Sequence, residues 1–258
     1  LNKSETMLLD IISTNNWKRP IYFGIGIPTD SYMGLEKYFQ VEGATYRLVP
    51  IETPSKRNEY GGTDYGRIDS DILYDNIMNK FEWGNIKNPK VNIDNFHDII
   101  IGSMQYRNTM QRLASQLHQE GKDDKAVKVL DKSLEELPLS QVPIDIVFLD
   151  YITLYYELGE TEKANHLLNE LATDNFQMLK YVNSLSPKFA DTPGIQREEN
   201  ISFYTLQKLF EAAYNAGQKD IAENIKNKVE SIVNPNWMRP APATHAPIKD
   251  SAPEVEIQ

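Results

Sequence analysis

Few residues in this chain have the types and spacing needed for catalysis or metal binding. No two of its four histidines are four positions apart, and no HExxH pattern occurs. Cysteine is absent, which excludes thiolate catalysis, disulfides and cysteine-type zinc sites. There is no GxSxG nucleophile pattern, and acidic pairs such as Glu135–Glu136 are typical of solvated helix faces. We therefore expect no catalytic residue, metal or cofactor in this segment.

Gly24 and Gly26 lie where a dinucleotide-binding loop could begin. The fingerprint of such a loop requires a third glycine three positions later, but position 29 is Thr and Pro28 precedes it. The surrounding run IYFGIGI at 21–27 instead predicts a buried strand whose glycines allow close backbone approach.

Three segments of the chain repeat one helical pattern. Each has amphipathic periodicity, then a glycine, then an alanine five positions later. The segments are LHQEGKDDKAVKVL at 117–130, YYELGETEKANHLL at 155–168 and AYNAGQKDIAENIK at 213–226, with the pairs Gly121 and Ala126, Gly159 and Ala164, and Gly217 and Ala222. Glycine permits a sharp turn between helices, and alanine lets the second helix approach the first. The pattern predicts tetratricopeptide-like helix pairs that stack into an α-solenoid.

The repeat also has departures. Ile152 and Phe210 are bulky where the pattern has a small residue, so we expect those helix pairs to pack more loosely or at altered angles. The second and third glycines are 58 residues apart, whereas the usual unit is about 34 residues. Within the excess, DNFQMLKYVNSL predicts an extra helix capped by Asp174, and SPKFADTPGIQ predicts a surface loop.

Before residue 97 the patterns predict a small α/β unit with an aromatic core. The predicted elements are a helix over 4–14 capped by Ser4, strands over 21–27 and 45–51, a helical turn or two over 35–40, a loop over 52–70 with a turn at Gly61–Gly62, and a helix from Ser70 or Asp71 to about 82 followed by Gly84 at its C′ position. In the first helix Met7, Leu8, Ile11 and Ile12 form one apolar face.

Composition and periodicity divide the chain into three parts. We predict a mainly α protein with the α/β unit over 1–96, helical repeats over 97–234 and a proline-rich tail over 235–258. The net charge of −10 argues against nucleic-acid binding. No run approaches the ~20 apolar residues of a membrane helix.

In a tetratricopeptide stack, the exposed face of the first helix of each pair lines a concave groove. Ring side chains alternate there with polar ones and are suited to clasping a peptide or stacking on a sugar. The groove candidates are Gln111, Ser115, His118, Thr153, Tyr156, Gln207, Glu211 and Tyr214. Alternatively, Tyr156 and Tyr214 cover the seam between repeats, and the sequence leaves both interpretations open.

The stretches at 4–28 and 34–50 resemble a known family. SETMLLDIISTNNWKRPIYFGIGIP and GLEKYFQVEGATYRLVP are similar to the C-terminal soluble region of bacterial multi-span membrane proteins, which resemble protein O-mannosyltransferases and other polyprenyl-phosphate-sugar glycosyltransferases. In that family the segment similar to Asn16–Phe23 follows the last membrane span, and helical repeats come later. The resemblance implies a domain on the extracytoplasmic, periplasmic face, tethered by spans upstream of Leu1. It also implies that the sugar-transfer residues lie in that membrane part, so none is assigned here.

We therefore expect a non-catalytic binding or scaffold domain of a membrane glycosyltransferase-like protein, contacting a partner protein, an acceptor polypeptide or a glycan. One alternative is a self-contained peptide-binding adaptor, which would be cytoplasmic. A groove that binds peptide carboxylates uses Lys and Arg, and the groove candidates include neither. A second alternative, a glycan-processing enzyme, lacks supporting catalytic residues.

Overall fold

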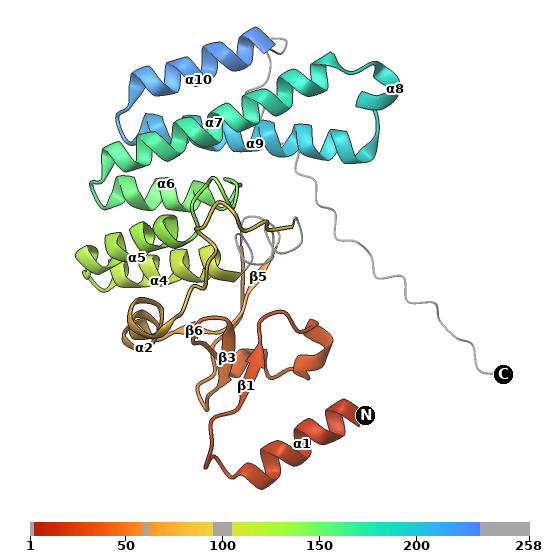
Figure 1. Ribbon diagram of the computed structural model, residues 1–258, viewed down its shortest axis with the longest axis vertical. Coiled ribbons are helices and arrows are strands. Elements are labelled where there is room, and N and C mark those ends of the chain that lie inside the picture. The colour runs from red at the N-terminus through yellow and green to blue at the C-terminus, as the bar shows by residue number, and fades with distance from the viewer. Residues whose placement is uncertain (1–2, 59–61, 95–104, 233–258) are drawn as a thin grey trace, which may run out of the picture. The chain divides into compact units, whose positions relative to one another are not determined.

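The computed structural model describes residues 3–58, 62–94 and 105–232 and is mainly helical, with a small sheet region near the N-terminus (Figure 1). The chain divides into two compact units, residues 1–171 and 172–258. The predicted boundary between residues 96 and 97 and the predicted tail over 235–258 lie outside the described residues. Among the described helices, none combines the length and apolar character needed to cross a bilayer.

The sheet of the first unit has the strand order β1-β3-β2-β6. Its strands are β1 (Tyr22–Gly24), β3 (Thr45–Leu48), β2 (Phe39–Val41) and β6 (Arg67–Ile68). β3 pairs antiparallel with both β1 and β2, and β2 pairs parallel with β6. The predicted strand over 21–27 is too long, because the chain turns after Gly24, where the Ile27 N–H donates to the Gly24 carbonyl over 3.3 Å. The predicted strand over 45–51 ends at Leu48.

The core of this sheet is aromatic, as predicted. Phe23, Tyr32, Phe39 and Tyr46 are all buried. The Phe39 ring lies 4.9 Å from Phe23, 5.0 Å from Tyr32 and 4.9 Å from Tyr46, measured between ring centroids. Rings packed at these separations and angles stabilise a small unit beyond the apolar area that they bury.

Several short elements were not predicted. The segment 35–40 does contain the predicted helical turn, the 3₁₀ turn η2 (Glu36–Tyr38), but it then enters the unpredicted strand β2. Another 3₁₀ turn, η1, spans Thr29–Tyr32. The predicted loop over 52–70 contains a hairpin of β4 (Lys56–Arg57) and β5 (Thr63–Asp64), followed by β6. The turn predicted at Gly61–Gly62 falls partly outside the described residues, but Gly62 N–H does donate to the Asn58 side chain over 2.8 Å.

Two helices of the first unit begin earlier than predicted. α1 (Lys3–Asn15) confirms the helix over 4–14, but it already includes Ser4, so Ser4 is not its N-cap. α2 (Ser70–Asp75) is capped by Asp69, whose carboxylate accepts a hydrogen bond from Ile72 N–H, rather than by Ser70 or Asp71. α2 continues into a π-turn, η3 (Asn76–Lys80), and Phe81 is extended, so Gly84 lies beyond the helix end and is not its C′ residue.

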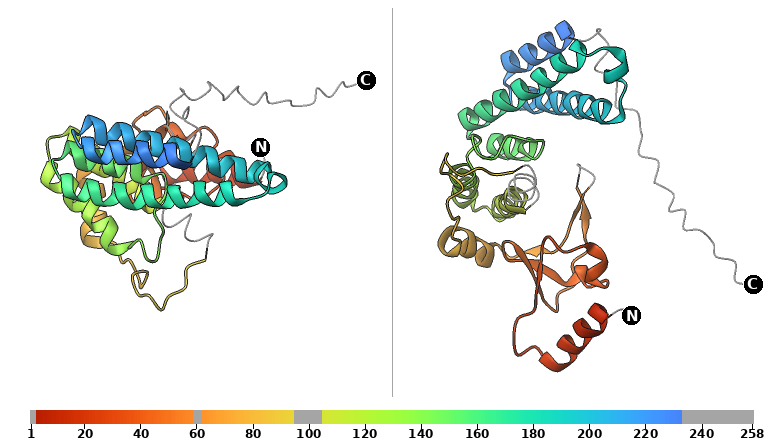
Figure 2. Two further views of the ribbon diagram at one scale, coloured as in Figure 1. Left: turned by 90° about the horizontal axis from the view of Figure 1, so that it is seen from above. Right: turned by 45° about the vertical axis from the view of Figure 1, so that its right-hand side comes forward.

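The remaining described helices follow one another along the chain. The first unit contains α4 (Asn108–Gln119), α5 (Asp123–Glu136), α6 (Phe148–Glu157) and the start of α7 (Thr161–Ser184). The second contains the end of α7, then α8 (Pro187–Ala190), α9 (Pro193–Asn215) and α10 (Lys219–Ile232). Figure 2 shows α10 running alongside α9, and the Asn183 side chain of α7 donates to the Ile232 carbonyl at the end of α10 over 2.9 Å.

Two predictions between the second and third repeats are wrong. Asp174 does not cap a separate helix, because α7 continues through it to Ser184 with Phe176, Leu179 and Val182 buried beyond it. Burial raises the pKa of the Asp174 carboxyl. The predicted surface loop is instead α8 and the start of α9, whose first turn contains Pro193, a position where proline is compatible with a helix.

Candidate binding surface

The three repeat glycines form the same helix-ending turn. Gly121, Gly159 and Gly217 have φ values of 71°, 79° and 76°. Each donates its N–H to the carbonyl three residues earlier, and the following residue donates to the carbonyl five residues earlier over 2.8 Å in every case. This pair of bonds defines the Schellman turn, which satisfies helix-end carbonyls and favours glycine because φ is positive.

The repeat alanines are also equivalent in local environment. Ala126, Ala164 and Ala222 are all buried, and each donates its N–H to the carbonyl four residues earlier, in the first turn of the following helix. The recurrent turn and the buried small residue make α4–α5, α6–α7 and α9–α10 three hairpins of the same local design.

On α4, the candidate residues are paired with neighbouring groups. Gln111 Nε2 donates to Ser115 Oγ over 3.1 Å, one helical turn away. His118 Nδ1 lies 2.7 Å from Asp123 Oδ1, across the turn at the start of α5. The Asp123 carboxylate therefore orients the imidazole and leaves Nε2 as its second polar atom.

On α6, the two candidates bond within their own hairpin. Thr153 Oγ1 donates to the Leu149 carbonyl over 2.9 Å, and Tyr156 OH donates to Asn165 Oδ1 on α7 over 2.7 Å. Burial raises the pKa of Tyr156 to about 12. These contacts are what we expect of a tyrosine that covers a seam, whereas its half-exposed ring is what a groove would require.

On α9, the candidates are two partly buried polar side chains and one exposed ring. Gln207 Nε2 donates to Glu211 Oε1 over 3.1 Å, which matches the Gln111–Ser115 bond of α4 in position relative to the turn glycine. Glu211 also pairs with Lys208 at 3.1 Å. Tyr214 is 58% exposed and stacks on Phe210, with ring centroids 6.0 Å apart and an interplanar angle of 18°.

The structure groups the candidates by unit. Those on α4 and α6 belong to the first unit, where these two helices are in contact, and those on α9 belong to the second. Within the described residues, no group of three or more His, Asp and Glu side chains is arranged to hold a metal ion.

Arg107 is a structural residue that the sequence did not reveal. Its side chain is fully buried just before α4, and its guanidinium lies 4.6 Å from the centroid of the Phe148 ring. It donates to three carbonyls of the α5–α6 connection, those of Leu137 at 3.0 Å, Val142 at 2.7 Å and Pro143 at 2.7 Å. The charged donor thus fixes the path of this connection and the entry into α6.

Two tyrosines of α6 join the first hairpin to the second. Tyr151 OH donates to the Arg107 carbonyl at 3.0 Å and lies 2.8 Å from Ser133 Oγ on α5. Tyr155 OH donates to Asp131 Oδ1 at 2.8 Å, and Lys163 of α7 reaches the same carboxylate at 2.8 Å. Burial raises the pKa values of both tyrosines, and the nearby Asp131 carboxylate raises that of Tyr155 further.

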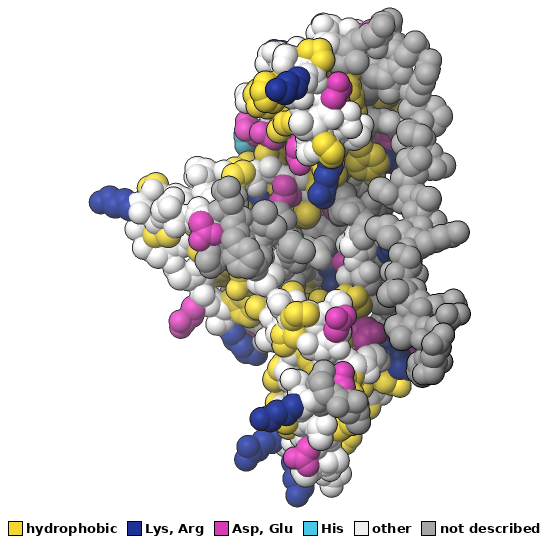
Figure 3. Space-filling view, turned by 90° about the vertical axis from the view of Figure 1, so that its right-hand side faces the viewer, with side chains coloured by type: hydrophobic (Ala, Val, Ile, Leu, Met, Phe, Trp, Pro, Cys, Tyr) yellow, Lys and Arg dark blue, Asp and Glu magenta, His cyan; other side chains and the backbone are white. Residues whose placement is uncertain are grey.

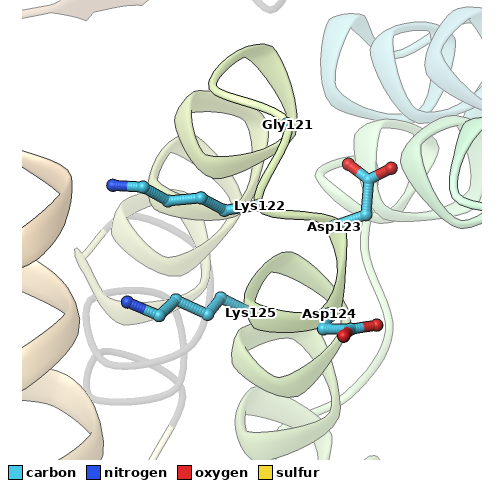
Figure 4. A pocket seen from close by; sticks show the side chains of 5 residues that line it. All are labelled: Gly121, Lys122, Asp123, Asp124 and Lys125. Atoms are coloured by element: carbon cyan, nitrogen blue, oxygen red, sulfur yellow. The ribbon is translucent and has the colours of Figure 1, made fainter.

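The turn at Gly121 holds the first hairpin against α2. Figure 4 shows a shallow hollow at this turn, with Lys122 and Lys125 pointing to one side and Asp123 and Asp124 to the other. Lys122 pairs with Asp71 of α2 at 3.1 Å, and Lys125 lies over the Tyr74 ring at 4.8 Å. Because both cations are engaged by α2, the hollow is a packing seam rather than an anion site.

Glu120 completes this contact between the α/β part and the hairpin. It accepts hydrogen bonds from Ser70 Oγ at 2.6 Å and Gln116 Nε2 at 2.9 Å, and it pairs with Lys122 at 2.8 Å. The bonds from Lys122, Ser70 and Gln116 lower the pKa of Glu120 to about 2. The carboxylate is therefore ionised at neutral pH and links α2 to the end of α4.

Comparison with known proteins gives one family match, in the N-terminal part of the chain. Residues 1–72 match the family described as TMEM260-associated domain 2, a family linked to a membrane protein. The match covers the segment in which α1, the sheet and the start of α2 lie. No curated protein and no solved structure matches the chain.

Proposed function

We propose that the helical part of this chain is a non-catalytic, tetratricopeptide-like scaffold that binds an extended polypeptide. In this proposal the chain is the C-terminal part of a membrane glycosyltransferase-like protein and lies on the extracytoplasmic face. The bound polypeptide is a partner subunit or an acceptor presented to the membrane part. No catalytic role is assigned to any residue of this segment.

The recurrence of one turn carries the proposal. Gly121, Gly159 and Gly217 share the same backbone bonds, so residues at equal distances before each glycine occupy equivalent positions on their helices. On α4 and α9, the side chains ten and six residues before the glycine are hydrogen-bonded to each other. On α6, the residue six positions before the glycine, Thr153, bonds instead to the backbone carbonyl of Leu149. On each helix, these positions and the ring three residues before the glycine form a short row that is suited to the backbone groups of a bound polypeptide.

The side-chain chemistry favours an internal peptide segment over a peptide terminus. The candidate positions hold amides, hydroxyls, rings and one carboxylate, Glu211, and none holds Lys or Arg. A free carboxylate would lack a cationic partner in this row, whereas peptide N–H and C=O groups can pair with Gln and Ser side chains.

Tyr214 offers the sharpest test, because it is exposed and does not belong to the buried face of α9. The chain would be applied to arrays of synthetic peptides and of mannose-containing glycans, as wild type, as Tyr214→Ala and as Tyr181→Ala. Tyr181 is the matched control, since it is 54% exposed in the same unit but lies on α7, outside the row.

We expect peptide binding that weakens by about tenfold in Tyr214→Ala, which corresponds to one buried aromatic contact, and that is unchanged in Tyr181→Ala. If the chain bound only the glycans, its ligand would be a sugar and not a polypeptide. Absence of binding on both arrays, or equal loss in the two variants, would overturn the proposal.

A further inference from the structure

Helix α1 exposes apolar side chains to an unusual degree. None of its 13 residues is buried, whereas α4, with 12 residues, buries five. Met7 is 57% exposed and Ile11 is 49% exposed, and the two lie one helical turn apart on the same face. The apolar face predicted for α1 is therefore present, but the rest of the unit covers it only in part.

The turn after α1 presents a tryptophan outward. Asn16 and Trp17 have φ values of 47° and 57°, a left-handed conformation that is costly for a bulky residue. The Asn15 side chain holds this turn from both directions, because Nδ2 donates to the Arg19 carbonyl at 2.7 Å and Oδ1 accepts from Arg19 N–H at 3.2 Å.

Burial of the indole does not offset this backbone cost, since Trp17 is 58% exposed. A strained backbone that displays a large apolar ring is typical of a binding surface.

Basic residues lie directly beside the exposed ring. Lys18 and Arg19 follow Trp17 and are exposed, and neither forms a salt bridge within the part of the chain that the structure describes. Tryptophan next to Lys and Arg, at the end of a helix with an apolar face, is the composition found at membrane interfaces, where the indole lies at headgroup level and the cations meet phosphates.

We infer that α1 and the turn to Arg19 form a membrane-contact surface that lies on a phospholipid bilayer. Met7, Ile11 and Trp17 enter the headgroup region, and Lys18 and Arg19 contact lipid phosphates. Figure 3 shows one face of the protein, on which hydrophobic side chains lie among Lys, Arg, Asp and Glu side chains. Residues 1–72, which include this surface, match a family linked to a membrane protein.

The charges on α1 determine how this surface binds. The charged residues of α1 are Lys3, Glu5 and Asp10, and together they are net negative. They offset part of the positive charge of Lys18 and Arg19, so apolar contact supplies more of the binding than attraction to anionic lipid. The few exposed apolar side chains give weak binding to a free chain. If the chain is tethered to the same membrane, the effective concentration of this surface at the bilayer is high, and even weak contacts keep it there.

Vesicle flotation tests this inference on the whole chain. Wild-type protein would be mixed with phosphatidylcholine vesicles, with and without phosphatidylglycerol, and compared with Trp17→Ala and Phe189→Ala. Phe189 is the matched control, because it is also 58% exposed but lies on α8 in the second unit. We expect flotation with both vesicle types, greater with phosphatidylglycerol, a loss of about tenfold in Trp17→Ala, and no change in Phe189→Ala.

A second measurement separates loss of contact from altered folding. Brominated lipids should quench tryptophan fluorescence of the wild type and quench Trp17→Phe much less, while circular dichroism stays the same. Absence of flotation with either vesicle type overturns the inference, as does undiminished flotation of Trp17→Ala. Concentration-dependent dimers that disappear in Met7→Ser/Ile11→Ser would overturn it too, by assigning the surface to a second copy. These outcomes are independent of the peptide arrays.

Discussion

The first and last hairpins of this protein share a turn but differ in what surrounds them. α4–α5 and α9–α10 both have the Schellman glycine and the buried alanine. In the first unit, Arg107, Tyr151 and Tyr155 join the first hairpin to the connection and helix that follow it. On α9, by contrast, Gln207 and Lys208 bond along the helix to Glu211.

This difference separates two roles of the residues in a repeat: forming each hairpin and joining one hairpin to the next. The repeated residues specify how two helices turn and pack as a hairpin, because they occur in every copy. The contacts between successive hairpins of the first unit depend on residues that occur once, such as Asp131 and Lys163. Stability of the hairpin and stability of the stack should therefore respond to different substitutions.

The largest effect should follow from removing the buried cation. Arg107→Met leaves three carbonyls of the α5–α6 connection without their charged donor, and we expect a loss of about 3 kcal/mol of unfolding free energy. Urea unfolding followed by circular dichroism measures the loss. Arg197→Met, at an exposed position on α9, should leave the midpoint unchanged. An equally stable Arg107→Met protein would show that the connection does not depend on this side chain.

Replacing a turn glycine by alanine should lower the free energy of unfolding by a smaller amount, and by the same amount in both units. A Cβ at Gly121, Gly159 or Gly217 meets open space, so replacement by Ala incurs only the cost of a left-handed backbone, about 1 kcal/mol each. Gly194→Ala, inside α9 with open space and no positive φ, should be neutral or slightly stabilising. Thermal unfolding of the four variants measures these effects, and unequal costs would mean that the three turns are not equivalent.

The ion pair between Asp131 and Lys163, which joins two hairpins, should contribute still less to the free energy of unfolding. Asp131 and Lys163 are both partly exposed, so a double-mutant cycle with Asp131→Asn and Lys163→Met should give a coupling energy of about 0.5 kcal/mol. The equivalent positions one hairpin later are Asn169 and Ile221, which cannot form an ion pair. A cycle at those two positions is the control, and coupling of similar size there would remove the contrast between the hairpins.

The smallest effect is a dependence on pH. The pKa of Glu120 falls from its ordinary value of 4.5 to about 2 in the folded protein, so its ionised form stabilises the fold above pH 4.5 and this contribution is lost as pH falls through about 2. Because the group is exposed, the contribution is a few tenths of a kcal/mol. Glu120→Gln should show a shallower decrease of stability between these pH values, and an identical pH profile would contradict the prediction.

Elements with strong local signals could be predicted from the sequence. The hairpin helices have long apolar periodicity, and glycine and alanine mark their turns, so the helices around Gly121, Gly159 and Gly217 were placed correctly. The short strands β2 and β6 were not predicted, because two or three residues carry little periodicity and their pairing depends on distant segments. Asp174 was misassigned as a cap because an aspartate inside a long helix gives the same local signal as one at its start.

For the candidate surface, the sequence predicted which residues occupy equivalent positions but not which groups their side chains contact. Spacing from the glycines identified Gln111 and Gln207 as equivalent, and the structure gives both a hydrogen bond to the residue four positions later. Spacing could not distinguish Tyr156, whose hydroxyl bonds to α7, from Tyr214, whose ring is exposed. Arg107 had no signal at all, since its partners are backbone carbonyls that every sequence provides.

That dependence on carbonyls has a consequence for how related sequences can diverge. The Arg107 guanidinium recognises the backbone of Leu137, Val142 and Pro143 and not their side chains. Substitutions at the exposed positions of this connection should therefore be tolerated as long as the number of residues between the anchor points is kept, whereas the buried side chains of Leu137 and Val142 are constrained by packing. Insertions or deletions should be rare there, and a peptide tag would be better accommodated elsewhere.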